Sequence, residues 1–108
     1  MAGQRVVSGV VLNERVSFSL SELCGCCDVS AEYVIELVDE GVVLPLGGQP
    51  AQWRFRGDQI KRVQMAVRLA EDLRLNLPGV ALALELMDEL DELRRLQQRA
   101  RRLEDWPG

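Results

Sequence analysis

The chain has no histidine among its 108 residues. This absence excludes Ser–His and Cys–His catalytic pairs, imidazole metal ligands and a histidine pH switch. No run of 18 apolar residues occurs, so we expect no membrane-spanning helix and no membrane partner. The start shows no charged segment followed by an apolar stretch and a small-residue cleavage site, which favours a cytoplasmic protein.

Cysteine is scarce and confined to one place. Cys24, Cys26 and Cys27 lie within four residues, and such an odd, clustered set forms no disulfide framework. A zinc site would need further nitrogen or sulfur ligands, which the sequence does not supply. We interpret the cysteines as reduced thiols packed as small hydrophobic residues, with a metal or redox site as the alternative. We expect no metal and no cofactor.

Charge is unevenly distributed in a chain whose formal net charge is −4. Residues 1–50 carry seven acidic residues and two arginines, whereas residues 51–84 carry six basic residues and three acidic ones. Residues 85–108 carry seven acidic residues and five arginines, with the arginines gathered between Arg94 and Arg102. The chain as a whole is therefore no electrostatic nucleic-acid binder, although a local basic patch remains compatible with the sequence.

Two short helices joined by a tight turn are predicted near the start. Ser19 and Glu22 have the spacing of a capping box, and Ser30 suits the N-cap of a second helix that Gly41 ends. Leucines, valines and cysteines recur at helical spacing along both segments: Leu20, Leu23, Cys24, Cys27, Val34, Leu37 and Val38. This is the helix-turn-helix pattern.

A β-wing and a third helix are predicted next. Trp53-Arg54-Phe55 alternates as a half-buried strand does, with a partner strand expected around Val42 to Leu44. We expect Trp53 to pack under this wing, and Asp58 to cap the third helix. That helix should bury a stripe of Ile60, Val63, Val67, Ala70 and Leu69 or Leu73.

The whole sequence thus predicts a mainly α chain of three parts. Residues 1–15 form a weakly ordered N-terminal arm or, from Arg5 to Leu12, a weak strand. Residues 16–75 form a winged helix-turn-helix domain with a small β-wing. Residues 76–108 hold a long C-terminal helix that runs from about Gly79 to about Asp105.

The last helix carries more apolar residues than a small domain can cover. Val80, Ala83, Met87 and Leu90 are expected to continue the core. At 1.5 Å per residue, about 27 residues extend about 40 Å, so a second set near heptad spacing needs a partner. We expect homodimerisation through Leu86, Leu93, Leu96 and Leu103. The alternative is a helix that folds back on its own wing.

The sequence resembles the winged-helix domain of MerR-type regulators over Phe18–Leu23, Val29-Ser30, Glu40–Val43 and Trp53–Phe55. Leu75 to Asp88, with its Pro78-Gly79-Val80-Ala81 helix opening, is similar to the chaperone modulators called CbpM. The resemblance covers roughly residues 16–96. It implies a MerR-like fold and a protein that binds the J-domain of a DnaJ-like, curved-DNA-binding co-chaperone (CbpA type). It also implies inhibition of that partner's co-chaperone and DNA-binding activities, and association with the nucleoid through the partner.

The second helix distinguishes a modulator from a DNA-binding regulator. Carboxylates follow its Ser cap where a DNA reader needs basic residues, and they would repel phosphates. We therefore interpret this face as the site for a basic J-domain helix that Hsp70 also uses. The candidate partner-binding residues are Glu32, Tyr33, Glu36, Asp39 and Glu40. An ordinary solvated face and a MerR-family transcriptional regulator are the alternatives. No nucleophile–base pair, phosphate-binding loop or metal set points to an enzyme.

Overall fold

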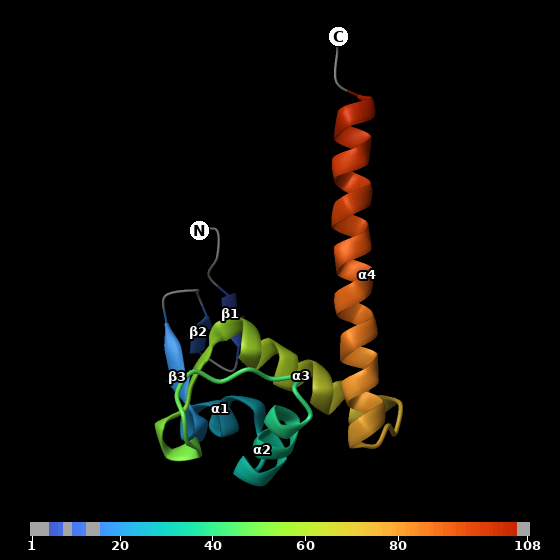
Figure 1. Cartoon of the computed structure of the whole chain (residues 1–108). Helices are drawn as coiled ribbons and strands as arrows, with labels where there is room; N and C mark the ends of the chain where they lie inside the picture. The colour runs from blue at the N-terminus through green and yellow to red at the C-terminus, as the bar shows by residue number, and fades with distance from the viewer. Residues whose placement is uncertain (1–4, 8–9, 13–15, 106–108) are drawn as a thin grey trace.

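A computed structural model describes residues 5–7, 10–12 and 16–105 of the chain. Most of the described residues are helical, as predicted, and the elements follow one another along the chain as Figure 1 shows. They are β1 (Arg5–Val7), β2 (Val10–Leu12), β3 (Ser17–Ser19), α1 (Leu20–Cys27), α2 (Ala31–Asp39), a 3₁₀ turn (Pro50–Gln52), β4 (Arg54–Arg56), α3 (Gly57–Asp72) and α4 (Leu77–Glu104).

The start of α1 is fixed by the predicted capping box. The Ser19 hydroxyl accepts a hydrogen bond from the Glu22 backbone N–H at 3.1 Å, and the Glu22 carboxylate accepts one from the Ser19 N–H at 2.9 Å. The hydrogen bond from the Ser19 backbone N–H, with a smaller contribution from the Ser19 side chain, lowers the pKa of Glu22, because it favours the charged carboxylate. The helix ends at Asp28, whose φ of 54° turns the chain toward α2.

Both predicted ends of α2 are confirmed. The Ser30 hydroxyl accepts a hydrogen bond from the Tyr33 N–H at 3.1 Å. At the other end, Gly41 has a φ of 78° and donates to the Val38 carbonyl at 2.9 Å, while Val42 donates to Leu37 at 3.2 Å. This is a Schellman ending, in which glycine takes the left-handed conformation without steric cost. The helix pair α1–α2 therefore has the predicted helix-turn-helix form.

The wing differs from the prediction in its pairing. Strand β4 pairs antiparallel with β3, so that Phe18 faces Phe55, and on its other edge Arg54 exchanges two hydrogen bonds of 2.8 Å with Leu46. The expected partner strand at Val42 to Leu44 was wrong. The Val42 carbonyl accepts from Arg62 and the Leu44 N–H donates to Gln59, so these backbone groups are already bonded to α3 side chains.

The N-terminal segment contains a short hairpin where we expected either a weak strand or a loosely ordered arm. Strands β1 and β2 pair antiparallel, with Val6 opposite Val11. The rest of residues 1–15 lies outside the described part of the chain.

Helix α3 begins two residues earlier than predicted. Arg56 takes the N-cap position and Asp58 lies in the first turn without a side-chain capping bond, so the predicted Asp58 cap was wrong. A carboxylate in the first turn still complements the positive end of the helix dipole. Of the predicted stripe, Ile60 and Val63 are buried, whereas Leu73 is 63% exposed because α3 has already ended.

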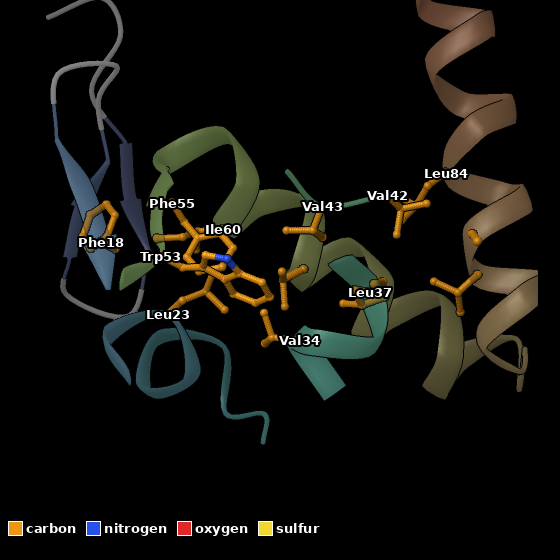
Figure 2. Packing of buried hydrophobic residues seen from close by; sticks show 14 residues of the cluster. Phe18, Leu23, Val34, Leu37, Val42, Val43, Trp53, Phe55, Ile60 and Leu84 are labelled. Atoms are coloured by element: carbon orange, nitrogen blue, oxygen red, sulfur yellow. The ribbon is translucent and has the colours of Figure 1, made fainter. Parts of the chain in front are cut away.

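One hydrophobic core joins the wing to the helices (Figure 2). Phe55 is fully buried, and the ring of Trp53 meets it edge to face with 5.9 Å between centroids. Trp53 is only 8% exposed, which confirms that it packs inside. One edge-to-face pair adds about 0.5–1.5 kcal/mol beyond the burial of its two rings. The core also holds Phe18, Leu23, Val34, Leu37, Val42, Val43, Ile60, Val63, Ala66, Val80, Ala81 and Leu84.

Helix α4 joins this core by its first two turns only. The Asn76 side chain accepts a hydrogen bond from the Gly79 N–H at 2.9 Å and starts the helix. Val80 is buried as predicted and Ala83 is half-buried, but Met87 and Leu90 are 37% and 46% exposed. The prediction that these two residues lie in the core was wrong, because α4 has left the winged domain by then and projects as a rod (Figure 1).

Arg62 of α3 fixes this arrangement. Its Nε donates a hydrogen bond of 2.6 Å to the Val42 carbonyl, just after α2, and a terminal nitrogen lies 2.7 Å from the Asp88 carboxylate of α4. The guanidinium is well suited to such two-sided bonding, since its donors are held in a rigid plane. One side chain thus joins α2, α3 and α4.

Two glycines give a matched test of these helix ends. Nothing lies within 4 Å of a Cβ built at Gly25 or Gly41, but only Gly41 has a positive φ. Gly25→Ala in α1 should stabilise the fold by about 0.5–1 kcal/mol, since alanine favours helix. Gly41→Ala should destabilise it by about 1 kcal/mol, since the left-handed conformation is strained. Chemical denaturation measures both, and equal effects would contradict the assignment of the α2 end.

Candidate partner-binding surface

The four acidic residues predicted to bind a partner lie exposed on α2 and its C-cap. They are Glu32, Glu36, Asp39 and Glu40. Glu32, Glu36 and Glu40 are four residues apart, which places them along one side of the helix. Within residues 16–105, none of the four carboxylates forms an ion pair with a basic side chain. We call these four residues the acidic face.

Asp39 and Glu40 do not stabilise the helix on which they lie. The C-terminal end of a helix carries a partial negative charge, so acidic residues there are unfavourable by a few tenths of a kcal/mol or more. Both residues occupy that end of α2, and no basic residue lies in its last turn. Glu32 lies in the first turn, where a carboxylate stabilises the helix. The positions of Asp39 and Glu40 therefore favour contact with another molecule over a contribution to the stability of α2.

Tyr33 has a different environment from the four acids. Its ring packs against the hydrophobic core, and its hydroxyl is buried with no hydrogen-bond partner in the described part of the chain. Burial, together with the charge of Glu36, raises the pKa of Tyr33, because both disfavour the phenolate. In this structure Tyr33 attaches α2 to the core, and its direct contact with a partner stays a prediction.

The wing arginines differ in how free they are to bind a phosphate. Arg54 donates to the Ser17 carbonyl at 2.8 Å and to the Ser17 hydroxyl at 3.2 Å, and it lies 3.8 Å from Glu22. Its donors are thus largely used within the sheet. Arg56 is exposed at the end of β4. The wing therefore offers little of the phosphate contact that would place α2 in a DNA groove.

A second exposed surface runs along α4. The predicted dimerisation residues Leu86, Leu93, Leu96 and Leu103 are 54%, 58%, 48% and 77% exposed. Leu82 and Leu90 are also exposed on this helix; the prediction left Leu82 out and assigned Leu90 to the core. Leu82 was detectable in the sequence, because it continues the same heptad spacing toward the start of the helix. We call these six leucines the α4 stripe.

The three cysteines form no disulfide and lie half-buried. The Cys27 thiol donates a weak hydrogen bond to the Ile60 carbonyl at 3.7 Å. Burial raises the pKa of Cys27 to about 11, and burial also raises that of Cys24. Across residues 16–105, no group of three His, Cys, Asp or Glu residues is placed to hold a metal ion. This geometry suits packed neutral thiols, because metal binding and redox exchange need the thiolate.

In the part of the chain that the structure describes, no helix combines the length and the apolar character needed to cross a bilayer.

Comparison with known proteins finds clear relatives. The family described as MerR HTH family regulatory protein matches residues 18–105. A protein named Chaperone modulatory protein CbpM from Coxiella burnetii is 31% identical over 101 residues, which cover 94% of this chain and 92% of the relative. Proteins of the same name from Pseudomonas entomophila and Pseudomonas putida are 43% and 39% identical over 79 residues, 73% of this chain. These names describe modulators rather than enzymes.

The raised pKa of Cys27 predicts a pH dependence of stability. Below the ordinary value of 9.0, folded and unfolded chains both carry the neutral thiol. Between 9.0 and about 11, only the unfolded chain releases the proton, so the free energy of unfolding should fall as pH rises. Cys27→Ser keeps a donor for Ile60 but lacks this titration. Urea denaturation from pH 8 to 10.5 should show a steeper decline in the native chain, and identical slopes would refute the assignment.

Proposed function

Because the chain belongs to the CbpM chaperone modulators, which are built on the MerR-type helix-turn-helix, we propose that its acidic face binds the J-domain of a DnaJ-like, curved-DNA-binding co-chaperone. The coarser role, a chaperone modulator, follows from the family. In this proposal the bound chain covers the J-domain surface that Hsp70 uses. It thereby inhibits the co-chaperone and DNA-binding activities of its partner, and it needs no bond chemistry of its own.

The observation that carries the proposal is the sign of the charge on α2. In a helix-turn-helix protein that reads DNA, the second helix enters the major groove between two rows of phosphates. The acidic face would bring four carboxylates toward those phosphates, and no counterions would be released in exchange. The same face attracts a basic helix, and such complementarity speeds encounter and selects partners of opposite charge.

The division of the chain follows from the same arrangement. We assign partner binding to the winged domain, residues 16–75, and dimerisation to residues 76–108. The α4 stripe supports the second assignment, because six leucines remain exposed on one helix. Apolar surface of this extent on one element is typical of an interface. A second copy of the chain is the occupant we propose, since most soluble oligomers are symmetric.

A DNA-binding regulator is the alternative, and exposed Arg56 on the wing is the feature that favours it. Titration against duplex DNA and against a purified J-domain, each at increasing salt, distinguishes the two functions. Tight binding to DNA with a steep loss of affinity in salt, and none to the J-domain, would reverse our proposal.

Charge reversal tests the acidic face. The double variant Glu32→Lys, Glu36→Lys should bind a J-domain about tenfold more weakly or worse, because two attractive contacts become repulsive. Glu104→Lys, Asp105→Lys is the matched control, with the same change of net charge at the far end of α4. Isothermal titration calorimetry measures both. Equal losses in the two variants would mean that the binding face lies elsewhere.

Sedimentation tests the dimer. The native chain should sediment as a dimer at micromolar concentration. The variant Leu93→Asp, Leu96→Asp should sediment as a folded monomer, because carboxylates in the α4 stripe would be buried without partners if two copies paired through it. Circular dichroism checks that α4 is still formed. A native chain that runs as a monomer would refute this part of the proposal.

A further inference from the structure

Five arginines lie on the last part of α4, and no acidic residue lies between the first and the last of them. They are Arg94, Arg95, Arg99, Arg101 and Arg102, and all five are exposed. At 1.5 Å per residue, they span about 12 Å of the helix axis. We propose that these five residues, which we call the arginine face, bind the phosphate backbone of double-stranded DNA independently of its base sequence.

The helix dipole accounts for only some of these charges. Basic residues near the end of a helix complement its partial negative charge, but the effect falls off within the last turn. Of the five arginines, Arg101 and Arg102 lie in the last turn of α4. Arg94, Arg95 and Arg99 lie further from the end, so the stability of the helix does not explain their positions.

Three of the arginines also form a row of like charges. Arg99 lies four residues after Arg95 and three residues before Arg102, and residues at these spacings are neighbours on a helix surface. Like charges at such positions destabilise a helix by a few tenths of a kcal/mol per pair. A bound anion would remove this repulsion, so the row favours an anionic ligand.

The arginine face is little neutralised by the chain itself. Arg94 lies 4.0 Å from Asp91, and Arg95 lies 3.9 Å from Glu92. Both pairs are long and exposed, and such pairs contribute little. Within residues 16–105, the other three arginines form no ion pair with an acidic side chain. Most of the positive charge is therefore available to a ligand.

Neither the winged domain nor the α4 stripe covers the arginine face. Leu84 is the last buried residue of α4 in the described part of the chain, and Arg95 lies about 16 Å further along the helix axis. Figure 1 shows that this part of α4 projects beyond the winged domain. With about 100° of rotation per residue, Arg95, Arg99 and Arg102 lie about 120° or more around the helix from Leu93. The face therefore stays accessible when the stripe is paired.

The composition of the arginine face favours phosphates over a protein surface. An interface with a folded protein has an apolar core inside its polar rim. At about 100° per residue, Gln98 lies among the arginines, whereas Leu96 and Ala100 lie toward the stripe. The face thus offers hydrogen-bond donors and charge without an apolar anchor. Phosphate contacts need only such donors, and the release of counterions supplies the affinity.

The formal net charge of −4 does not prevent this contact. The acidic face lies on α2 and its C-cap, and Figure 1 shows α2 level with the start of α4 and far from its last turns. Exposed charges further apart than the Debye length, about 8 Å at physiological salt, are largely screened from each other. The arginine face therefore acts on DNA as a local basic patch.

Binding to DNA would bring the chain to the place where its partner acts. The proposed function gives the chain a co-chaperone partner that binds DNA. Attachment of both proteins to one duplex raises the local concentration of the acidic face near the J-domain. This consequence rests on the proposed function, whereas the contact between the arginine face and DNA does not. Such contact is weak and the same for every base sequence, unlike that of a regulator that reads bases.

Fluorescence anisotropy with labelled duplexes tests the contact. We expect a Kd of about 10⁻⁵ M at physiological salt, the middle of the range for sequence-independent binding. Two duplexes of unrelated sequence should give the same Kd within about twofold. The slope of log K against log salt should lie between about −2.7 and −4.5, as three to five phosphate contacts would give.

Neutralising the row of arginines identifies the residues. The variant Arg95→Gln, Arg99→Gln, Arg102→Gln should bind the duplex about tenfold more weakly or worse, and its salt slope should be flatter by about 2.7. Glutamine favours helix as arginine does, and circular dichroism checks that α4 is still formed. The affinity for a J-domain alone should not change, because the acidic face is untouched.

A matched control removes the same net charge from the winged domain. The variant Arg56→Gln, Arg68→Gln, Arg74→Gln changes three exposed arginines and should alter the Kd for the duplex by less than about threefold. Equal losses in the two variants would overturn the arginine face as the site of contact.

The remaining outcomes separate this inference from the proposed function. A native chain that binds a J-domain but no duplex at about 50 mM salt would overturn this inference alone. A chain that binds the duplex through the arginine face, but no J-domain, would support the contact and refute the proposed function. Tighter binding to polyglutamate of equal charge than to the duplex would assign the face to an acidic protein and overturn the choice of DNA.

Discussion

The position of the acidic face relative to the α4 stripe depends on the hydrogen bonds that the Arg62 guanidinium donates. It bonds to the carbonyl of Val42, directly after the end of α2, and to Asp88, where α4 leaves the winged domain. The apolar contact of α4 with the core ends at Leu84, so without Arg62 only about two turns would hold a helix of 28 residues. Arg62 therefore adds to the packing of Val80, Ala81 and Leu84 in holding the direction of α4 relative to the acidic face.

The acidic face is built at a small cost in stability that the neighbouring sequence offsets. Asp39 and Glu40 oppose the dipole at the end of α2. The Schellman ending at Gly41 satisfies the last carbonyls of that helix, and the fully buried Val34 and Leu37 attach it to the core. The helix can thus carry unfavourable charges because its stability comes from burial and from its cap.

The sequence predicted those features that depend on neighbours in the chain. The Ser19 capping box, the Ser30 cap and the Gly41 ending involve residues at most five apart, and all three are present. The partner of β4 depends on contacts between distant segments, and Gln59 and Arg62 compete for the backbone of Val42 to Leu44. No pattern of neighbouring residues in the sequence shows that distant side chains will bond to these backbone groups. The same holds for Met87 and Leu90, whose helical spacing is right for a core that ends one turn earlier.

The candidate site was predictable to a similar degree. Helical spacing suffices to place Glu32, Glu36 and Glu40 together, because all three lie on one element. The environment of Tyr33 was not predictable in this way, since its burial depends on how α2 packs against the rest of the core.

The acidic face and the α4 stripe need different physical properties, and this explains why they lie on different parts of the chain. An interface that recruits a basic partner works best when its charges are solvated in the free state and attract from a distance. An interface between two copies works best when apolar area is concentrated and the flanking charges select one direction. The acidic face has no exposed large hydrophobic residue on α2, while the stripe has six leucines. The two surfaces also lie on different elements, because the acidic face lies on α2 and its cap, whereas the six leucines lie on α4.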